Sequence, residues 1–228
     1  THFEAKNTEI ILLSEYGIND VNTPIHLNRI LREAGKIAIR EEQGLELLDP
    51  GVSEAFAVSD HQIAHIYCKN PSEIRTLLEK VPGIAKILSG KELKEYQIAH
   101  ERCGDLVLVA DSDKWFSYYY WLDDAKAPDF ARCVDIFKKP GYDPVEMFMD
   151  PKNPFIKLRA AYKLARKLLG FRYRMDVIPL DASLVKGSHG SPFCDEAYYP
   201  VFISSQNIDK QIPATQVYQY IWETIFPN

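Results

Sequence analysis

Hydrophobic and polar residues alternate in short blocks along the chain, and these blocks predict interleaved strands and helices. An unbroken apolar run over 10–14 is typical of a strand covered on both faces. Apolar residues at helical spacing over 25–35 predict a helix that ends at a glycine. The remaining blocks predict strands at 55–58, 63–68, 83–88, 105–111 and 199–205, and helices at 71–80, 155–169 and 214–226.

The order of these elements predicts an α/β protein with a mostly parallel sheet and helices on both faces. We expect the runs 10–14 and 106–110 to be interior strands of one sheet, because both are apolar without alternation. Residues 52–104 follow a strand, strand, helix, strand order, which predicts a small α+β appendage. Residues 112–153 are rich in aromatics, Asp and Pro and predict a long structured loop or cap.

Composition narrows the class of protein. The chain has 228 residues, of which 46% are hydrophobic and 26% charged, enough for one globular domain with a sizeable core. A net charge of -5 gives no chain-wide basic field, so we expect no specific nucleic-acid binding. No apolar run reaches the roughly 18 residues of a transmembrane segment. The four cysteines form no C-x-x-C pair, which favours a cytoplasmic or other reducing compartment.

Acidic residues close two of the predicted strands. Glu15 follows the first apolar run, Asp111 ends the strand at 105–111, and "KGSHG" places His189 between glycines. Ligands collect outside the carboxyl ends of strands in open α/β sheets, and zinc takes carboxylate and imidazole donors. This pattern indicates a metal site. The alternative is that Glu15 caps a turn and His189 is an ordinary loop histidine.

Several segments give a more specific signal when they are taken together. "IILLSEYGI" joins an apolar run to Ser, an acid, an aromatic and Gly, and "IHLNRILREAG" is an Asn-containing helix ending in Gly. The others are "GDLVLVADSDKWF", "KGSHGSP" with "YPVFISS", and "IPATQVYQYIW". In order and spacing, across nearly the whole chain, they resemble the type I phosphodiesterase/nucleotide pyrophosphatase branch of the alkaline-phosphatase superfamily.

This resemblance implies an alkaline-phosphatase-like fold and a metal-dependent phosphoric-ester hydrolase. Two divalent ions, zinc or manganese, would activate a Thr or Ser nucleophile that attacks a small phosphate ester or nucleotide-like substrate. The resemblance places Glu15 and Tyr16 at the family's Asp-His ligand pair and His189 at its late His ligand. Both residues of this pair depart from the family pattern. Glu15 can still donate an oxygen, but Tyr16 is a neutral phenol with a pKa of about 10 and is a poorer ligand than imidazole.

The same resemblance implies that part of the site lies outside this sequence. The family's nucleophile, its first metal-binding Asp and an Asp-x-x-x-His pair lie upstream of the turn that follows Ser14 here. We therefore expect residues 1–228 to be the C-terminal portion of such an enzyme, incomplete at the N-terminal side, with the upstream half of the same protein as its partner. Alone, the chain would be metal-free and inactive. We also expect Glu15, Tyr16 and His189 to converge at one rim of the sheet.

Two aromatic or histidine patterns have competing interpretations. The run "WFSYYYWLDD" either lines a substrate pocket or fills the core; under the first interpretation Tyr118, Tyr120 and Lys186 are the candidate substrate-binding residues. His61 and His65 have the i, i+4 spacing that suits zinc on a helix. Ile63, Ile66 and Tyr67 indicate a strand instead, where the two imidazoles would lie roughly 13 Å apart, so we expect an ordinary surface strand.

Two other functional classes stay open. The departure at Tyr16 and the missing nucleophile are also expected of a non-catalytic binding or scaffold relative. The segment 151–175 carries eight Lys or Arg and no acid, and its predicted helix 155–169 is amphipathic. Such a helix either forms a peripheral membrane-binding module or packs by its apolar side and leaves a solvated basic face.

Overall fold

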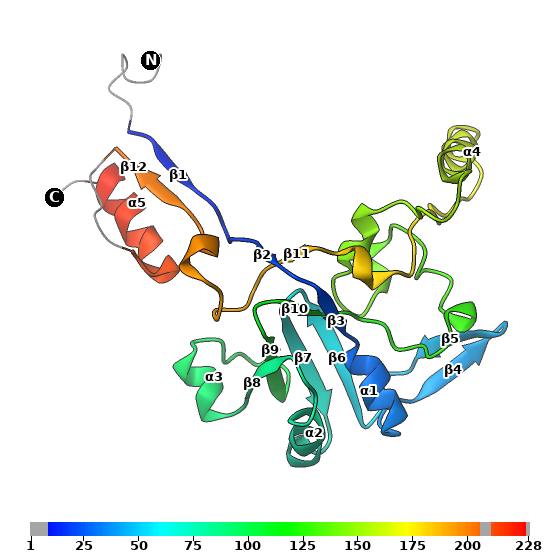
Figure 1. The fold of residues 1–228 in the computed structure, drawn as a ribbon, viewed down its shortest axis with the longest axis horizontal. Helices are drawn as coiled ribbons and strands as arrows, with labels where there is room; N and C mark the ends of the chain where they lie inside the picture. The colour runs from blue at the N-terminus through cyan, green and yellow to red at the C-terminus, as the bar shows by residue number, and fades with distance from the viewer. Residues whose placement is uncertain (1–8, 206–210, 227–228) are drawn as a thin grey trace. The chain divides into compact units, whose positions relative to one another are not determined.

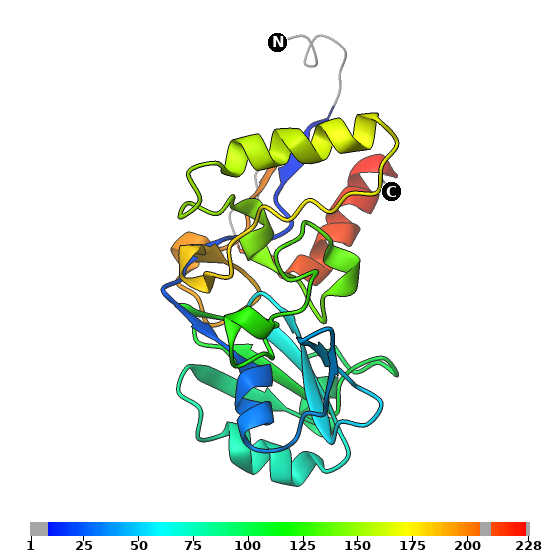
Figure 2. The same cartoon turned by 90° about the vertical axis from the view of Figure 1, so that its right-hand side faces the viewer.

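The computed structural model describes residues 9–205 and 211–226, and the chain divides into two compact units. The smaller unit comprises Thr1–Ile18 and Asp195–Asn228, and the larger comprises Asn19–Cys194. Each unit contains both strands and helices (Figures 1 and 2), so the chain has an α/β fold. The predicted subregions 52–104 and 112–153 both fall within the larger unit, and their separate character stays a prediction.

The smaller unit contains a two-stranded sheet and a helix. β1 (Ile11–Leu13) pairs antiparallel with β12 (Phe202–Ser204), and α5 (Val217–Ile225) follows. Leu12 and Leu13 are 61% and 45% exposed, so the prediction that this run is a covered, interior strand is wrong. The apolar pattern signals that the strand needs cover, but in this unit β1 is paired along one edge only.

The larger unit is built on a four-stranded sheet in the order β6 (Ala55–Asp60), β7 (Ile63–Cys68), β9 (Leu106–Ala110) and β8 (Ile84–Leu88), shown in Figure 1. Every neighbouring pair in it is antiparallel. This corrects the predicted mostly parallel sheet, and it also separates β9 from β1, which were expected in one sheet. The cause lies in the connections, because a two-residue turn between β6 and β7 can join only antiparallel strands.

β9 is an interior strand, as predicted, and all five of its residues are buried. One face of the sheet packs against α1 (Leu27–Glu33) and α2 (Pro71–Leu78), and the other packs against α3 (Lys91–Glu95). Alternate residues of β9 serve the two faces: Leu106, Leu108 and Ala110 on the first, Val107 and Val109 on the second. Full burial of each such aliphatic side chain contributes about 1.5–3 kcal/mol.

A buried asparagine attaches α1 to the open edge of this sheet. The Asn28 side chain donates to the Ala57 carbonyl at 2.8 Å and accepts from the Ala57 N–H at 2.7 Å. β6 is an edge strand, so these backbone groups have no strand neighbour on that side. The amide therefore replaces one residue of a missing strand and fixes the helix in register.

The larger unit also contains short strands that the sequence pattern did not reveal, and two of their three pairings join segments far apart in the chain. β2 (Asn19–Asp20) pairs with β11 (Gly187–Ser188), β4 (Ile39–Glu42) pairs with β5 (Leu45–Leu48), and β3 (Thr23–Ile25) pairs with β10 (Lys114–Phe116). Only the last of these pairings is parallel, and it is the only parallel strand pairing within the residues that the structure describes. Two to four residues with mixed polarity carry too little periodicity to predict a strand.

The segment that follows β10 packs mainly through aromatic side chains rather than regular structure. Together with Trp115 of β10, its buried residues Tyr118, Tyr119, Tyr120 and Trp121 form much of the second core of the larger unit. Three 3-10 turns follow, at Asp124–Lys126, Ile136–Lys138 and Pro144–Met147. The predicted helix near the basic segment is confirmed as α4 (Ile156–Leu168), but none of its residues is buried.

Candidate functional site

In the smaller unit, the two predicted ligands Glu15 and Tyr16 follow the end of β1, and both are exposed. The strand end is held because the Ser14 N–H donates to the Val201 carbonyl at 2.9 Å. At Gly17 the chain passes so close to Tyr198 that a Cβ would lie 1.5 Å from its carbonyl oxygen. Only glycine fits there, so the direction of the chain after Tyr16 is set by this close approach.

In the larger unit, the loop that carries His189 begins as a strand and is fixed at its backbone. Ser188 pairs with Asn19 in the β2–β11 ladder, and the carbonyl of His189 accepts a hydrogen bond from the Gln62 N–H at 3.0 Å. Gly190 has a φ of +110°, which other residues rarely adopt, and turns the chain immediately after the histidine. Gly190 therefore shapes this loop directly after His189.

Gln62 is the hub of the hydrogen bonds beneath this loop. It is fully buried, and its amide nitrogen donates to the carbonyls of Ser112 at 2.8 Å and Lys114 at 3.0 Å. Its amide oxygen accepts from the Ser191 N–H at 3.1 Å and from the Asn19 side chain at 3.2 Å. One side chain thus joins the loop after β9, the loop around residue 190 and β2.

Three rings contact one another in pairs beside this network. The centroid of the His61 ring lies 4.0 Å from that of His189 and 4.7 Å from that of Tyr142. Tyr142 is placed by its N–H, which donates to the Ser59 carbonyl at 2.8 Å. The chain reaches that carbonyl because Gly141 has no Cβ, which would lie 2.3 Å from the Ser59 oxygen.

The environment of His61 keeps its imidazole neutral. The pKa of His61 is lowered to about 4, chiefly by burial and then by the nearby His189, against a smaller opposing effect of Asp60. At neutral pH the ring facing His189 is therefore uncharged. His65, the other histidine of the i, i+4 pair, lies on β7 and contacts the Gly104 N–H and Cys103 instead.

The candidate substrate residues occupy different environments. Tyr118 and Tyr120 are 0% and 1% exposed and belong to the aromatic core. Burial raises the pKa of Tyr120 to about 12, and it also raises the pKa of Tyr118 well above its usual value. Lys186 is exposed, one residue before β11. The core interpretation describes where both tyrosines lie, and a substrate-binding role for the three residues stays a prediction.

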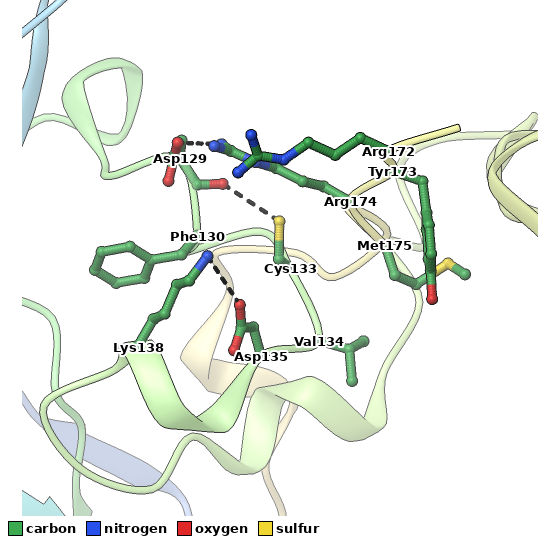
Figure 3. Close-up of a pocket in the computed structure, with 10 residues that line it drawn as sticks. All are labelled: Asp129, Phe130, Cys133, Val134, Asp135, Lys138, Arg172, Tyr173, Arg174 and Met175. Atoms are coloured by element: carbon green, nitrogen blue, oxygen red, sulfur yellow. Dashed lines mark hydrogen bonds and ion pairs between the residues drawn. The ribbon is translucent and has the colours of Figure 1, made fainter. Parts of the chain in front are cut away.

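A separate cavity of about 270 Å³ lies in the larger unit beside Cys133 (Figure 3). Arg174 pairs with Asp129 on its wall, and Lys138 pairs with Asp135 at 3.3 Å. Burial raises the pKa of the Cys133 thiol, which keeps it protonated and unreactive at neutral pH. With its charges mostly paired, this cavity gives no indication of the ligand chemistry that would fill it.

The two sets of predicted ligands lie in different units, Glu15 and Tyr16 in the smaller and His189 in the larger. Their convergence stays a prediction. Across residues 9–205 and 211–226, no group of three or more His, Cys, Asp or Glu side chains is arranged to hold a metal ion. The same residues include no helix long and apolar enough to cross a membrane.

Sequence reasoning missed Gln62 and Tyr142, although both shape the surroundings of His189. Gln62 and His61 form the two-residue turn between β6 and β7, and neither is a residue type that predicts a tight turn. Tyr142 lies far from both in the sequence and is joined to the turn through Ser59. No signal in the sequence pattern identifies either residue.

A comparison with models of known protein families gives one match, which covers residues 4–143. The model is described as type I phosphodiesterase / nucleotide pyrophosphatase. The chain belongs to this family. The family that the sequence motifs indicated is therefore confirmed.

Among solved structures, the chain is similar to phosphonoacetate hydrolase from Sinorhizobium meliloti 1021. The match to its complex with phosphonoformate has 15% identity and a TM-score of 0.48, and it covers 93% of this chain and 40% of that chain. The match to the complex with phosphonoacetate has 15% identity, a TM-score of 0.46 and the same coverage. The chain thus spans 40% of the length of these structures. A search of curated proteins found no match.

Proposed function

We propose that the protein to which this chain belongs hydrolyses phosphoric esters of the nucleotide type with the help of divalent metal ions, zinc or manganese. The observation that carries the proposal is the family match over 4–143. The loop at His189 supports it, because its backbone is fixed by β11, Gln62 and Gly190 while the imidazole is only partly buried. A preorganised and accessible imidazole is what a metal ligand requires.

The donors in this chain fit part of a metal site. Glu15 supplies a carboxylate, His189 an imidazole and Tyr16 a phenol, and zinc sites need about four ligands. We therefore propose that the nucleophile and the other ligands come from sequence outside residues 1–228, which form the C-terminal portion of an alkaline-phosphatase-like domain with subregions at 52–104 and 112–153. Bound metal ions would stabilise charge on the phosphoryl oxygens and activate the nucleophile.

Within this chain, the residues have distinct parts in the proposed site. His189 and Glu15 hold metal, and the exposed ammonium of Lys186 attracts the anionic phosphate group of the substrate. Lys186 suits a substrate role better than Tyr118 and Tyr120, because their rings are buried. For the tyrosines, the proposed contribution is to shape the wall of the site rather than to bind substrate directly.

The proposal is tested on the intact protein with bis(p-nitrophenyl) phosphate as the substrate. We expect a chelator to abolish hydrolysis, zinc or manganese to restore it, and His189→Ala to reduce both activity and the amount of bound metal. His100→Ala is the matched control, because His100 is an exposed loop histidine. Hydrolysis that withstands the chelator, or His189→Ala with wild-type activity and metal content, would contradict the proposal. Purified protein without stoichiometric metal would favour the non-catalytic relative.

A second function, contact with anionic membranes, is favoured by the exposure of α4. The helix has no acidic residue, and its apolar residues Leu158 and Leu168 are 68% and 86% exposed. Two of its basic side chains, Arg159 and Lys163, already pair with Asp176. Co-sedimentation with phosphatidylserine vesicles at low salt tests it, and equal sedimentation with neutral vesicles would exclude a charge-driven interaction.

A further inference from the structure

His61 occupies a backbone conformation that its position does not favour. It is the first residue of the two-residue turn between Asp60 and Ile63, and its φ is +55°. A two-residue hairpin turn with positive φ at the first position normally has glycine there. Histidine at this point costs backbone strain, and strained residues gather at functional sites.

The strained turn carries the His61 ring to His189. The planes of the two rings are 36° apart, with centroids separated by 4.0 Å. His61 also contacts the Tyr142 ring, and its carbonyl accepts a hydrogen bond from the Phe116 N–H at 2.7 Å. The His61 ring is therefore held by its backbone and by its contact with Tyr142, and it packs against His189.

The same turn fixes the backbone on which the His189 ring is mounted. The neighbouring residue Gln62 donates its N–H to the His189 carbonyl, and its side chain accepts from the Ser191 N–H two residues further on. With this backbone fixed, the orientation of the His189 ring is set by the contacts of its side chain. A flat ring packed at 4.0 Å restricts rotation of that side chain by steric contact.

We propose that His61 is a positioning residue for His189, whose ring orientation it fixes by packing its own ring, tilted by 36°, against that of His189. The proposal rests on the proposed function, because it gives the orientation of the His189 nitrogens a purpose in holding metal.

The test compares four forms of the intact protein: wild type, His61→Gly, His61→Phe and Gln43→Gly. Glycine suits the turn and removes only the ring, so His61→Gly is expected to fold with an unchanged or higher melting temperature. Phenylalanine restores a flat ring without a nitrogen. Gln43→Gly is the matched control, because Gln43 occupies the corresponding turn between β4 and β5 with a φ of +54°.

The first measurement is NMR of the metal-free protein with labelled histidine. We expect a cross-peak between the rings of His61 and His189 in wild type, and a His189 signal that moves toward its unfolded position in His61→Gly. His61→Phe and Gln43→Gly should keep the wild-type signal. A His189 signal unchanged in His61→Gly would overturn the proposal, as would one that is lost equally in His61→Phe with the fold intact.

The second measurement is steady-state kinetics with zinc bound. Loss of a group that orients a metal ligand typically reduces metal affinity or activity about 10–100-fold, so we expect a loss of that size in His61→Gly, mainly in kcat, with most of it recovered in His61→Phe. Full activity in His61→Gly would overturn the proposal. The NMR measurement needs neither metal nor substrate, so an inactive wild type would count against the proposed function without deciding the role of His61.

Discussion

Replacement of Lys139 by Met tests the interior of the larger unit most directly. The Lys139 ammonium has no exposed surface and lies 2.8 Å from the Asp143 carboxylate and 2.6 Å from that of Glu146. Both carboxylates are almost as deeply buried, with 2% and 10% of their side chains exposed. The Lys139→Met substitution leaves the side-chain volume nearly unchanged, but it leaves the buried carboxylates of Asp143 and Glu146 next to each other without their positive partner.

The expected decrease in the free energy of unfolding follows from the loss of the positive charge that neutralises the two buried carboxylates. Removal of one partner from a buried ion pair destabilises a protein by about 3–5 kcal/mol, because the remaining charge has lost its counter-ion and cannot reach water. For a unit of this size, about 2–4 °C of melting temperature is lost per kcal/mol, so we expect a fall of about 6–20 °C. Burial already raises the pKa of Asp143 in the wild type, so in the variant this group should take up a proton most readily.

Urea unfolding of wild type and variant at pH 7 and pH 5 measures the effect. A carboxyl group whose folded-state pKa is raised destabilises the fold as the pH rises through that pKa, so the deficit of Lys139→Met should shrink at pH 5. Lys138→Met is the matched control, because the neighbouring pair with Asp135 is partly exposed and should contribute less than about 1 kcal/mol. Equal losses in the two variants, or a deficit that grows on acidification, would refute the reasoning.

Three further predictions concern the edge of the sheet, the pH dependence and the activity. Asn28→Leu should cost about 2–4 kcal/mol in urea unfolding, because it leaves both backbone groups of Ala57 unpaired; Asn22→Leu, at an exposed site, is its control. The pKa of His26 is lowered to about 4, mainly by burial, so its imidazole stays neutral in the folded state but is protonated below about pH 6.5 in the unfolded state. The free energy of unfolding should therefore fall by up to about 3 kcal/mol as the pH drops from 6.5 to 4. The fall should be smaller in His26→Gln. The isolated chain 1–228 should not hydrolyse a chromogenic phosphodiester, and metal-dependent turnover that is lost in Glu15→Ala would contradict this.

The contacts of the His61 ring with His189 and Tyr142 also link the stability of the larger unit to the proposed site. Lys139 and Asp143 lie on either side of Gly141 and Tyr142 in the chain, and the buried ion pair therefore fixes the segment that places the Tyr142 ring. A variant that weakens the pair should also loosen the contact between Tyr142 and His61. The buried charges thus have an effect on the candidate site as well as on the core.

The local sequence pattern predicted those strands and helices whose buried positions can be recognised from the spacing of their own apolar residues. The apolar run of β9 is long enough to specify an interior strand, and the spacing of Leu27 and Leu31 specifies α1. Motif order also determined the family, because it depends on residue identity along the chain and not on packing. These features need no knowledge of which distant segment covers them.

Tertiary structure decided what those elements pack against and in which direction. The apolar run at β1 predicts a strand covered on both faces, yet Leu12 is exposed. An apolar pattern indicates that a strand tends to be buried, but it does not show which segment packs over it. The contact of His61 with Tyr142 and His189 joins three segments through backbone hydrogen bonds of the sheet and its turns, and such long-range pairing leaves no local periodicity. Sequence alone therefore determined the family and the candidate ligand His189, while the antiparallel topology and the rings around that ligand depend on contacts between residues far apart in the chain.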